Sequence, residues 1–460
     1  MKVLLVRSRP TNIKNTRLPL SLSREVGYVM PLGIASIAAF LRKKGVSVTI
    51  IDAEAEGLPL HDVRRRMEEC GPDLVGVTSM TPTVHDDLDI AAIAKHMGAK
   101  VVIGGPQANA MPIDTFSRSE VDFVIQGEGE VPMAQLVQAL NGEIPFSEVP
   151  GLVYADGGEG VRVNEPYINE KLDSLPFPAW DLLPYNRYHS IISKNRFATL
   201  SPNRGCPFLC GFCFKQPSDR KVRFRDPYSV VDEIEALVNR FHVKEINFVS
   251  DTLTVEKDFV FQLCDQILKR NIKFHWIAPT RADCVTKEML ALMKRAGCRS
   301  LRFGVESGSP EILKHMGKKT ALENVVEAFR WAREVKMETF AYFIVGYIHE
   351  TEKTMKETLR FVKILKPDLL MYNIATPMPG TRLWGQAVNA GLADPTYWKR
   401  FLMDRNTPRI PYLFKDSDKW IKKGYRDFYF SPRTIFRQAV SFRPKTIKSA
   451  LRAFRGLIRL

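Results

Sequence analysis

The first 140 residues alternate between short apolar runs and longer stretches in which hydrophobic residues recur with helical spacing. The apolar runs are rich in β-branched residues, as buried parallel strands are, and they occupy Val3–Val6, Ser47–Ile51, Leu74–Thr78, Lys100–Ile103 and Asp122–Ile125. The helical patterns occupy Leu32–Lys44, Leu60–Cys70, Val84–Met97 and Val131–Leu140. Five strands separated by helices predict an α/β domain with a doubly wound parallel sheet over residues 1–145.

A sheet of this flavodoxin-like or Rossmann-like type binds ligands beyond the carboxyl ends of its strands. Three loops fall there, and their candidate contact residues are Thr78, Ser79, Gly104, Gly105, Gly127 and Glu128. Glycine lets a backbone approach a bulky ligand closely, although a glycine after a strand is also compatible with a simple turn. The pattern predicts a ligand site at this edge of the sheet.

Residues 146–195 are rich in Gly, Pro and Asn and predict a linker with a small hairpin near Gly151–Tyr154. The alternation then resumes over residues 196–400. Strand patterns occupy Phe197–Leu200, Glu245–Val249, Phe274–Ala278, Ser300–Val305, Thr339–Val345 and Asp368–Ala375, and helical patterns occupy Ser229–Phe241, Asp258–Arg270, Lys287–Ala296, Leu322–Val335 and Thr351–Leu365. Six such units predict a partial (β/α)6 barrel, whose chemistry belongs at the carboxyl ends of the strands.

The loop after the first strand of this barrel carries Cys206, Cys210 and Cys213 in the spacing C-x3-C-x2-C. Thiolates are the usual ligands of iron–sulfur clusters, and a four-iron cluster normally takes four of them. Three closely spaced cysteines would therefore leave one iron open to a non-protein ligand. The alternative is a structural zinc site, but zinc wants four closed ligands, commonly in paired C-x2-C arms.

The composition is that of an ordinary globular protein of several domains, with 460 residues and a net charge of +16. The four other cysteines are scattered along the chain, and we predict that they are buried and take no part in the chemistry. We therefore expect no disulfide framework and a reducing, cytoplasmic location. No apolar run reaches the length of a membrane span, and the first residues read as a strand rather than a signal peptide.

Residues 401–460 predict a helical, basic extension. Between Ser431 and Leu460 there is no Asp or Glu, and the eight cations are Arg433, Arg437, Arg443, Lys445, Lys448, Arg452, Arg455 and Arg459. Ile447, Leu451, Phe454 and Ile458 would form one apolar stripe. Such a helix suits the anionic inner face of a membrane; the alternative is a helix docked on the barrel with its charges in solvent. The absence of interleaved aromatics argues against nucleic acid.

These residues together resemble the cobalamin-binding branch of the radical S-adenosylmethionine (SAM) superfamily, over nearly the whole chain. The cysteine motif carries the resemblance, with Val249–Thr252, Thr280–Asp283, Leu301–Ser309, Met316–Thr320 and Ala375–Thr381 beside it. The resemblance implies a [4Fe-4S] cluster on the three cysteines, SAM on the open iron, and cobalamin on the first domain. Without cobalamin, that domain would be a scaffold.

The resemblance also suggests contacts to SAM. Glu306 would accept from the ribose hydroxyls, Ser250 or Asp251 would accept from the amino group, and Arg281 or Ser307 would bind the carboxylate. The structural alternatives are a salt bridge for Glu306, a helix N-cap for Asp251, and pairing of Arg281 with Asp283 or Glu306.

Two departures from the family pattern matter. The turn after the fifth barrel strand reads Gly346-Tyr347-Ile348-His349-Glu350-Thr351 and lacks a Pro-Gly pair. The loop after the first strand, Arg7–Asn12, lacks the Asp-x-His-x-x-Gly motif that supplies a histidine to cobalt. Many members of this branch also lack that histidine.

What the resemblance implies is an enzyme that uses a one-electron reductant, such as flavodoxin or ferredoxin, to cleave SAM. It would methylate an unactivated carbon of a small molecule, with lipids, isoprenoids and tetrapyrroles as candidates. Oxidative ring closure, as in the anaerobic magnesium-protoporphyrin monomethyl ester cyclases, is the alternative, and RNA modification is a more distant one.

Overall fold

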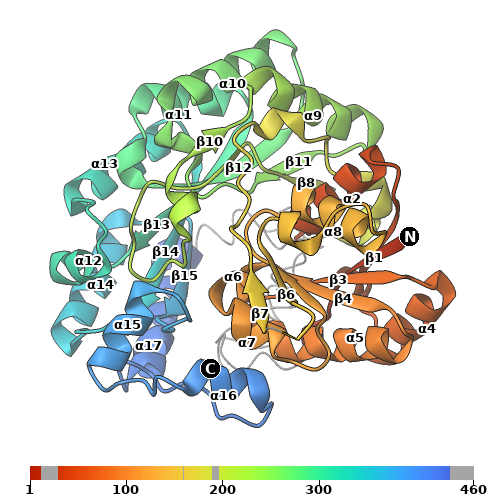
Figure 1. Cartoon of the computed structure of the whole chain (residues 1–460). Coiled ribbons are helices and arrows are strands. Elements are labelled where there is room, and N and C mark those ends of the chain that lie inside the picture. Colours follow the sequence, from red (N-terminus) through yellow and green to blue (C-terminus); the bar gives the residue numbers. More distant parts are fainter. Residues whose placement is uncertain (12–28, 159, 189–195, 436–460) are drawn as a thin grey trace.

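Two large sheets covered by helices, one of seven strands and one of six, dominate the computed structural model, which describes residues 1–11, 29–158, 160–188 and 196–435. In Figure 1 the red and orange N-terminal sheet lies beside the green-to-blue second sheet. The predicted helix over Ile447–Ile458 lies outside the described residues.

The first sheet has the predicted doubly wound topology. Its parallel part runs in the order β2-β1-β3-β4-β5, which is a flavodoxin-like order. The strands are β1 (Lys2–Arg7), β2 (Ser47–Asp52), β3 (Leu74–Thr78), β4 (Lys100–Gly104) and β5 (Phe123–Ile125), and the helices that cover them are α2 (Leu32–Lys43), α4 (Leu60–Cys70), α5 (Val84–His96) and α8 (Glu130–Leu140). The sheet is almost wholly buried, as the apolar runs predict.

The hairpin predicted within the linker belongs to this sheet. Strand β6 (Leu152–Ala155) pairs antiparallel with β5, and β7 (Val161–Val163) pairs with β6. The N-terminal sheet therefore continues past the predicted boundary at residue 145, because the free edge of β5 offers backbone groups that the hairpin satisfies.

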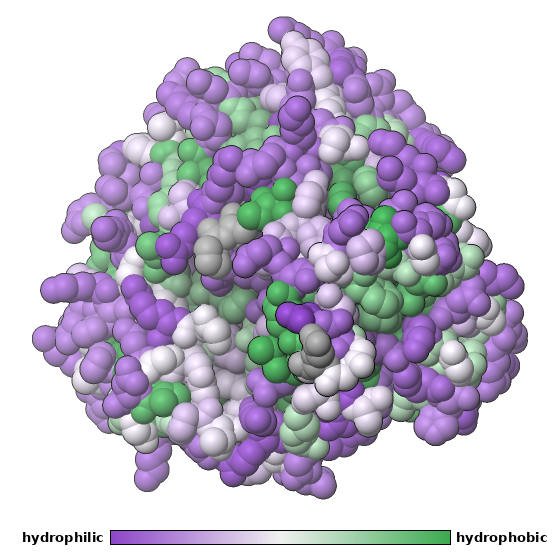
Figure 2. All heavy atoms as spheres, viewed as in Figure 1, coloured by the Kyte–Doolittle hydropathy of each residue, from purple (hydrophilic) through white to green (hydrophobic). Residues whose placement is uncertain are grey.

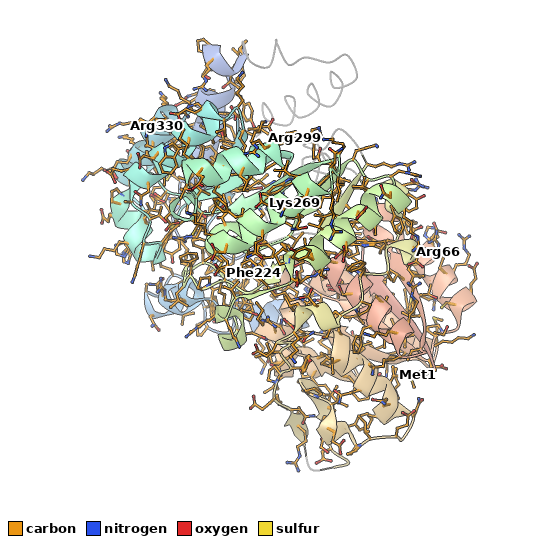
Figure 3. All side chains as sticks on the ribbon, turned by 90° about the horizontal axis from the view of Figure 1, so that it is seen from above. Met1, Arg66, Phe224, Lys269, Arg299 and Arg330 are labelled. Atoms are coloured by element: carbon orange, nitrogen blue, oxygen red, sulfur yellow. The ribbon has the colours of Figure 1, made fainter. Side chains whose placement is uncertain are left out.

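The second sheet has six parallel strands in the order β15-β14-β13-β12-β11-β8. Its strands are β8 (Phe197–Leu200), β11 (Glu245–Phe248), β12 (His275–Thr280), β13 (Cys298–Glu306), β14 (Glu338–Val345) and β15 (Leu369–Ile374), and its outer helices are α9 (Pro227–Arg240), α10 (Lys257–Lys269), α11 (Lys287–Arg295), α13 (Leu322–Glu334) and α14 (Glu352–Leu365). This is the predicted partial barrel. Charged side chains such as Arg330 and Lys269 extend outward from its helical layer (Figure 3).

Short elements that the periodicity does not predict complete the fold. They are α3 (Ala53–Glu56), α6 (Pro106–Ala110), α7 (Pro112–Phe116), the two-residue strands β9 (Asn203–Arg204) and β10 (Arg223–Phe224), α12 (Pro310–Met316), α15 (Arg382–Asn389) and α16 (Tyr397–Met403). The 13-residue helix α17 (Ser417–Tyr429) falls within the helical extension predicted for residues 401–460. Helix α16 returns to the N-terminal sheet, and its buried side chains share a core with that sheet's α5 side. Figure 1 shows α16 near α7.

The two sheets are joined through buried apolar contacts. One hydrophobic cluster contains residues of α2, residues of α9, and the buried Trp180 and Phe197 between them. In Figure 2, hydrophobic side chains gather towards the middle of the face shown and hydrophilic ones cover much of its rim. Among the described residues, none of the helices has the length and apolar character needed to span a membrane.

Candidate functional site

The cysteine loop leaves the carboxyl end of β8 and is held by glycines. Gly205 has a φ of +90°, and a Cβ there would lie 2.3 Å from the carbonyl oxygen of Lys221. Gly211 is equally enclosed, since a Cβ would lie 2.6 Å from the Tyr347 hydroxyl and 2.9 Å from Arg382. Its amide donates to Met316 and its carbonyl accepts from Leu383. The loop is therefore fixed on both sides of Cys210.

The three cysteines differ in exposure. Cys206 is buried, Cys210 is intermediate and Cys213 is exposed at the mouth of the barrel. The Cys206 amide donates to the Asp219 carbonyl over 2.8 Å, while Lys215 donates to the Cys206 carbonyl over 2.9 Å. These bonds fix the backbone, while the sulfur of Cys206 lies 3.8 Å from the Thr252 hydroxyl.

Although Cys213 as a residue is exposed, desolvation by the surrounding protein raises the pKa of its thiol to about 12, and the neighbouring Cys210 adds to that rise. Burial also raises the pKa of Cys210, against the opposing charges of Lys318 and Arg281. Thiols with raised pKa values are stabilised as thiolates when they bind a metal cation, and sulfur is a soft donor that suits iron. Across the described part of the chain, no three metal-ligating side chains are close enough to hold a single metal ion. The three sulfurs are donors of the kind that iron–sulfur clusters take.

Arg281, the residue expected at the SAM carboxylate, contacts both the cysteine loop and Asp283. Its Nη1 lies 3.8 Å from the sulfur of Cys210, and its Nε and Nη2 donate to both oxygens of Asp283. The predicted alternative, pairing with Asp283, is what the structure shows.

Ser250 and Asp251 follow β11 at the same end of the barrel. The Ser250 hydroxyl donates to Oδ1 of Asn203 over 2.6 Å, so its oxygen can still accept a hydrogen bond. Asp251 is exposed and caps neither of the helices that follow it, because those N-caps are Thr252 and Glu256. Both residues therefore stay available to a ligand.

Glu306 is the last residue of β13 and Ser307 follows it, but their side chains have different surroundings. Glu306 has a φ of +71°, uncommon for a residue with a side chain, and its Oε1 lies 3.1 Å from the Lys318 amine. Its other oxygen is not part of that pair. Ser307 is fully buried, and its hydroxyl lies 3.1 Å from that of Thr358, so it supports the turn rather than facing the loop.

A cavity of about 350 Å³ lies between the two sheets. Its wall includes five of the six predicted contacts, Thr78, Gly104, Gly105, Gly127 and Glu128, together with Ser201, Arg204 and Val249 from the barrel. A Cβ on Gly33 would meet no atom within 4 Å, and one on Gly104 would meet its nearest atom at 3.9 Å. Gly33 and Gly104 thus leave space for a ligand, whereas a Cβ on Gly105 or Gly127 would lie 2.9 Å from the Ser79 carbonyl oxygen or 3.0 Å from that of Tyr167.

Ser79 is the sixth predicted contact, and it is outside the cavity wall. It is completely buried, and its hydroxyl donates to Asp87 over 2.7 Å. Asp87 also accepts from Ser8 and Thr83. Burial raises the pKa of Asp87 to about 7, although the three hydroxyl donors oppose that rise. Ser79 thus holds the loop after β3 to helix α5 and does not line the cavity.

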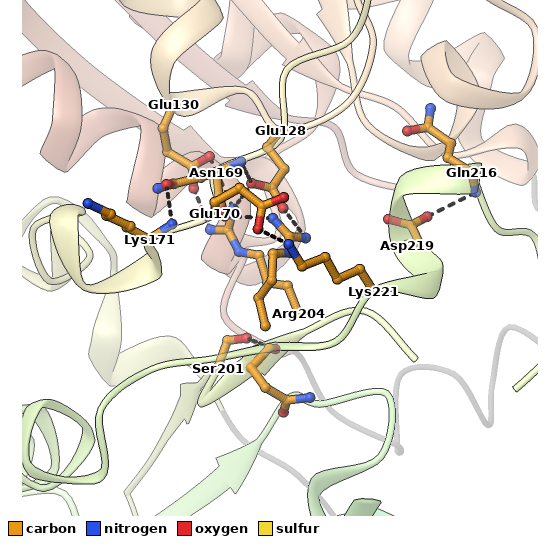
Figure 4. A network of polar contacts seen from close by, with 12 residues as sticks. Glu128, Glu130, Asn169, Glu170, Lys171, Ser201, Arg204, Gln216, Asp219 and Lys221 are labelled. Atoms are coloured by element: carbon orange, nitrogen blue, oxygen red, sulfur yellow. Dashed lines mark hydrogen bonds and ion pairs between the residues drawn. The ribbon is translucent and has the colours of Figure 1, made fainter. Parts of the chain in front are cut away.

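Glu128 does not face the cavity as a free carboxylate. It lies 3.2 Å from Arg204 and 2.7 Å from Arg223, and its neighbour Glu130 lies 2.5 Å from Arg204. The backbone amide of Asn169 donates to Glu128, and the carbonyl of Asn169 accepts from Arg223. We call Glu128, Glu130, Arg204 and Arg223 the interdomain ion cluster (Figure 4). Sequence reasoning missed the two arginines, although Arg204 stands two residues before Cys206.

Family comparisons agree with this geometry. A model of the B12 binding domain matches residues 23–137, and one of the radical SAM superfamily matches residues 200–362. An uncharacterized methyltransferase of Pyrococcus horikoshii is 31% identical over all of this chain and 98% of its own length. The chain belongs to the cobalamin-binding branch of the radical SAM superfamily.

Other relatives of this radical SAM enzyme carry different activities. The anaerobic magnesium-protoporphyrin IX monomethyl ester cyclase of Rubrivivax gelatinosus is 30% identical over 77% of this chain and 65% of its own length. The hopanoid C-3 methylase of Methylococcus capsulatus is 27% identical over 80% of this chain and 70% of its own.

The fold is that of the solved radical SAM methyltransferase TsrM from Kitasatospora setae, with a TM-score of 0.69 and 18% identity, covering 86% of this chain and 76% of that one. The two matching family models give the cofactors of this enzyme as a [4Fe-4S] cluster, SAM and cobalamin. Its substrate is a small molecule, and it needs a reductant.

Proposed function

We propose that this enzyme transfers a methyl group to an unactivated carbon of an apolar small molecule, such as a lipid, an isoprenoid or a tetrapyrrole. The observation that carries the proposal is the shared cavity, whose wall combines the glycine loops of the first domain with barrel residues next to the cysteine loop. Cobalamin and SAM held at these two sides would face the same space. When bound, the cofactors supply a radical oxidant and a methyl donor.

In this proposal each side of the cavity has its own residues. Cys206, Cys210 and Cys213 hold the cluster, while Ser250, Asp251 and Glu306 bind SAM. Thr78, Gly104, Gly105 and Gly127 cradle cobalamin, with residues 1–145 as its domain and 196–400 as the catalytic barrel. The protein's part is to orient the substrate and exclude water.

Exposed apolar side chains support an apolar substrate. Val249 is 43% exposed on the cavity wall, and Leu209 is 53% exposed inside the cysteine loop. Exposed apolar groups at a site mouth gain from covering by an apolar ligand. Methyl transfer is favoured over ring closure because the Pyrococcus horikoshii relative, named an uncharacterized methyltransferase, is matched over 98% of its length, whereas the cyclase of Rubrivivax gelatinosus is matched over 65% of its length.

The test uses full-length protein purified without oxygen, loaded with iron, sulfide and hydroxocobalamin, and supplied with trideuteromethyl SAM and a total lipid extract. A lipid or tetrapyrrole that gains a trideuteromethyl group supports the proposal. A product that has lost hydrogen and gained a ring, without label, overturns methyl transfer in favour of the cyclase alternative. The triple variant Cys206→Ala, Cys210→Ala, Cys213→Ala is the control, and it should bind no cluster and cleave no SAM.

We also propose that the enzyme works in the cytoplasm and contacts the membrane surface through its basic C-terminal residues. The sequence pattern after Phe442 supports this contact. A chain ending at Phe442 should lose partitioning to vesicles that contain anionic lipid. Equal partitioning of the two chains would contradict the membrane contact and leave the methyl transfer proposal standing.

A further inference from the structure

Arg281 stands directly after β12, and its side chain is only 8% exposed. On its outer side it is held by a closed ring of hydrogen bonds. Nε and Nη2 donate to Asp283 over 2.9 and 2.7 Å, Nη2 also donates to Thr320 over 2.7 Å, and the Thr320 hydroxyl donates to Asp283 over 2.9 Å. The guanidinium plane is therefore fixed before any cofactor binds.

On its inner side the same guanidinium touches the cysteine loop twice. Nη1 donates towards the Cys210 sulfur over 3.8 Å, and Cζ lies 3.7 Å from the centre of the Phe208 ring. Phe208 is two residues from both Cys206 and Cys210. Arg281 thus contacts the loop between its first and second cysteines through a charge-assisted hydrogen bond to Cys210 and a cation–π contact with Phe208.

We propose that Arg281 is a residue that positions the cluster loop and tunes the reduction potential of the cluster, rather than a ligand of the SAM carboxylate. The inference rests on the proposed function, because it needs the three cysteines to hold the cluster. Hydrogen bonds to cluster sulfurs and nearby charges are among the main controls of cluster potential.

The direction of the effect follows from charge. A flavodoxin- or ferredoxin-type donor is oxidised as it gives up one electron, and the cluster, reduced by that electron, becomes more negative by one unit of charge. An N–H and a positive charge beside Cys210 stabilise the reduced state more than the oxidised one. Asp283 opposes part of this effect because its carboxylate pairs with the guanidinium. Arg281 therefore raises the potential, and Asp283 limits the rise.

The experiment is a redox titration followed by electron paramagnetic resonance, on reconstituted full-length protein without SAM. Arg281→Met should shift the midpoint potential to a more negative value, while Asp283→Asn, which leaves the guanidinium uncompensated, should shift it to a more positive one. Arg330→Met, the same loss of charge on the outer face of α13, should leave the potential unchanged. The iron content of each protein is measured in parallel.

Two opposite shifts support the inference, because a purely structural role for Arg281 would not reverse sign in Asp283→Asn. If Arg281→Met fails to assemble the cluster, Asp283→Asn alone decides by the sign of its shift. Unchanged potentials at full iron content, with weaker SAM binding in Arg281→Met, would overturn the inference and return Arg281 to the SAM carboxylate. A wild-type protein without a four-iron signal would instead refute the proposed function.

Discussion

Gly205 shows how much of the cysteine loop depends on a single backbone position. Its φ is positive, and a Cβ would collide with the carbonyl oxygen of Lys221. We expect Gly205→Ala to cost about 1–3 kcal/mol in backbone strain alone and to lower the iron content. Denaturant unfolding and iron analysis measure both effects.

The control for Gly205 is Gly385→Ala. Gly385 lies within α15, where a Cβ would meet no atom within 4 Å. Alanine there should stabilise the protein by about 0.5–1 kcal/mol, since glycine weakens helices. If Gly205→Ala matched this control in stability and iron content, the loop would be shown to tolerate another backbone conformation at residue 205.

Asp87 predicts a pH dependence of stability. Burial holds its pKa near 7 in the folded state, above the unfolded value of 3.8, so the folded protein binds more protons between these values. Stability from this group is full below about pH 4 and is lost as the pH rises to about 7. Asp87→Asn, which keeps the size and can bond to the same hydroxyls, should flatten that fall by on the order of a few kcal/mol.

Unfolding in denaturant at a series of pH values between 4 and 8 measures this difference. The comparison of variant with wild type isolates Asp87 from other groups, such as Glu350, whose pKa burial also raises to about 7. Parallel curves for the two proteins would contradict a buried, protonated Asp87.

At this scale, the sequence predicts which loops matter better than it predicts where side chains point. The spacing of Cys206, Cys210 and Cys213 and the glycines after the strands locate both sides of the cavity. Ser79, Ser307 and Glu128, which we expect to contact cofactors, also bond to Asp87, Thr358 and Arg223, partners that the sequence pattern does not predict. Such partners are set by tertiary packing, which no local pattern encodes.

Among the elements, the interdomain ion cluster connects the loop after β5 with β9 and β10. Arg204 and Arg223 come from the two short strands that precede and follow the cysteines, and Glu128 and Glu130 come from the cobalamin side. Replacing Arg204 by Met leaves the nearly buried Glu130 without its partner. We expect a loss of about 3–5 kcal/mol in stability, as for other broken buried pairs.

Thermal and denaturant unfolding measure this loss, and equilibrium titration with hydroxocobalamin shows whether the cavity keeps its shape. Arg330→Met is again the matched control, because Arg330 pairs with Glu327 and Glu334 on an exposed surface. Such pairs contribute about 0–1 kcal/mol. Equal losses in the two variants would contradict a structural role for the ion cluster.

The long elements were predictable and the short ones were not, for a physical reason. Over ten or more residues, as in α4 or α14, periodicity accumulates and marks the buried face. Helices α6, α7 and α12 span only five to seven residues. Each begins with proline, which favours the first position of a helix. A single proline is also compatible with a turn, so these segments read as loops.

For the molecule as a whole, α16 is decisive because it packs on the domain where the chain began. Phe401 is 1% exposed, and its ring centre lies 5.0 Å from that of His85 in α5. The Arg118 side chain donates to the carbonyls of Leu402 and Met403 at the end of α16. Helix α16 therefore joins the two domains a second time, beyond the linker.

We expect Phe401→Ala to cost about 3–5 kcal/mol and to lower the stability of the whole chain in a single transition. Phe430→Ala, at a side chain that is 50% exposed, is the control and should cost much less. Differential scanning calorimetry and limited proteolysis measure the outcome. Two separate transitions, with the N-terminal domain unaffected by Phe401→Ala, would contradict the proposed coupling.

The second attachment by α16 also bears on how substrate enters. Two domains that are joined at one place can rotate apart about that joint, but two domains that are joined at two separate places resist such opening. The linker and the shared core fasten one edge of this molecule, and α16 fastens another. We therefore expect substrate entry to depend on small movements of the loops at the rim of the cavity. A bulky substrate must then enter through an opening at that rim.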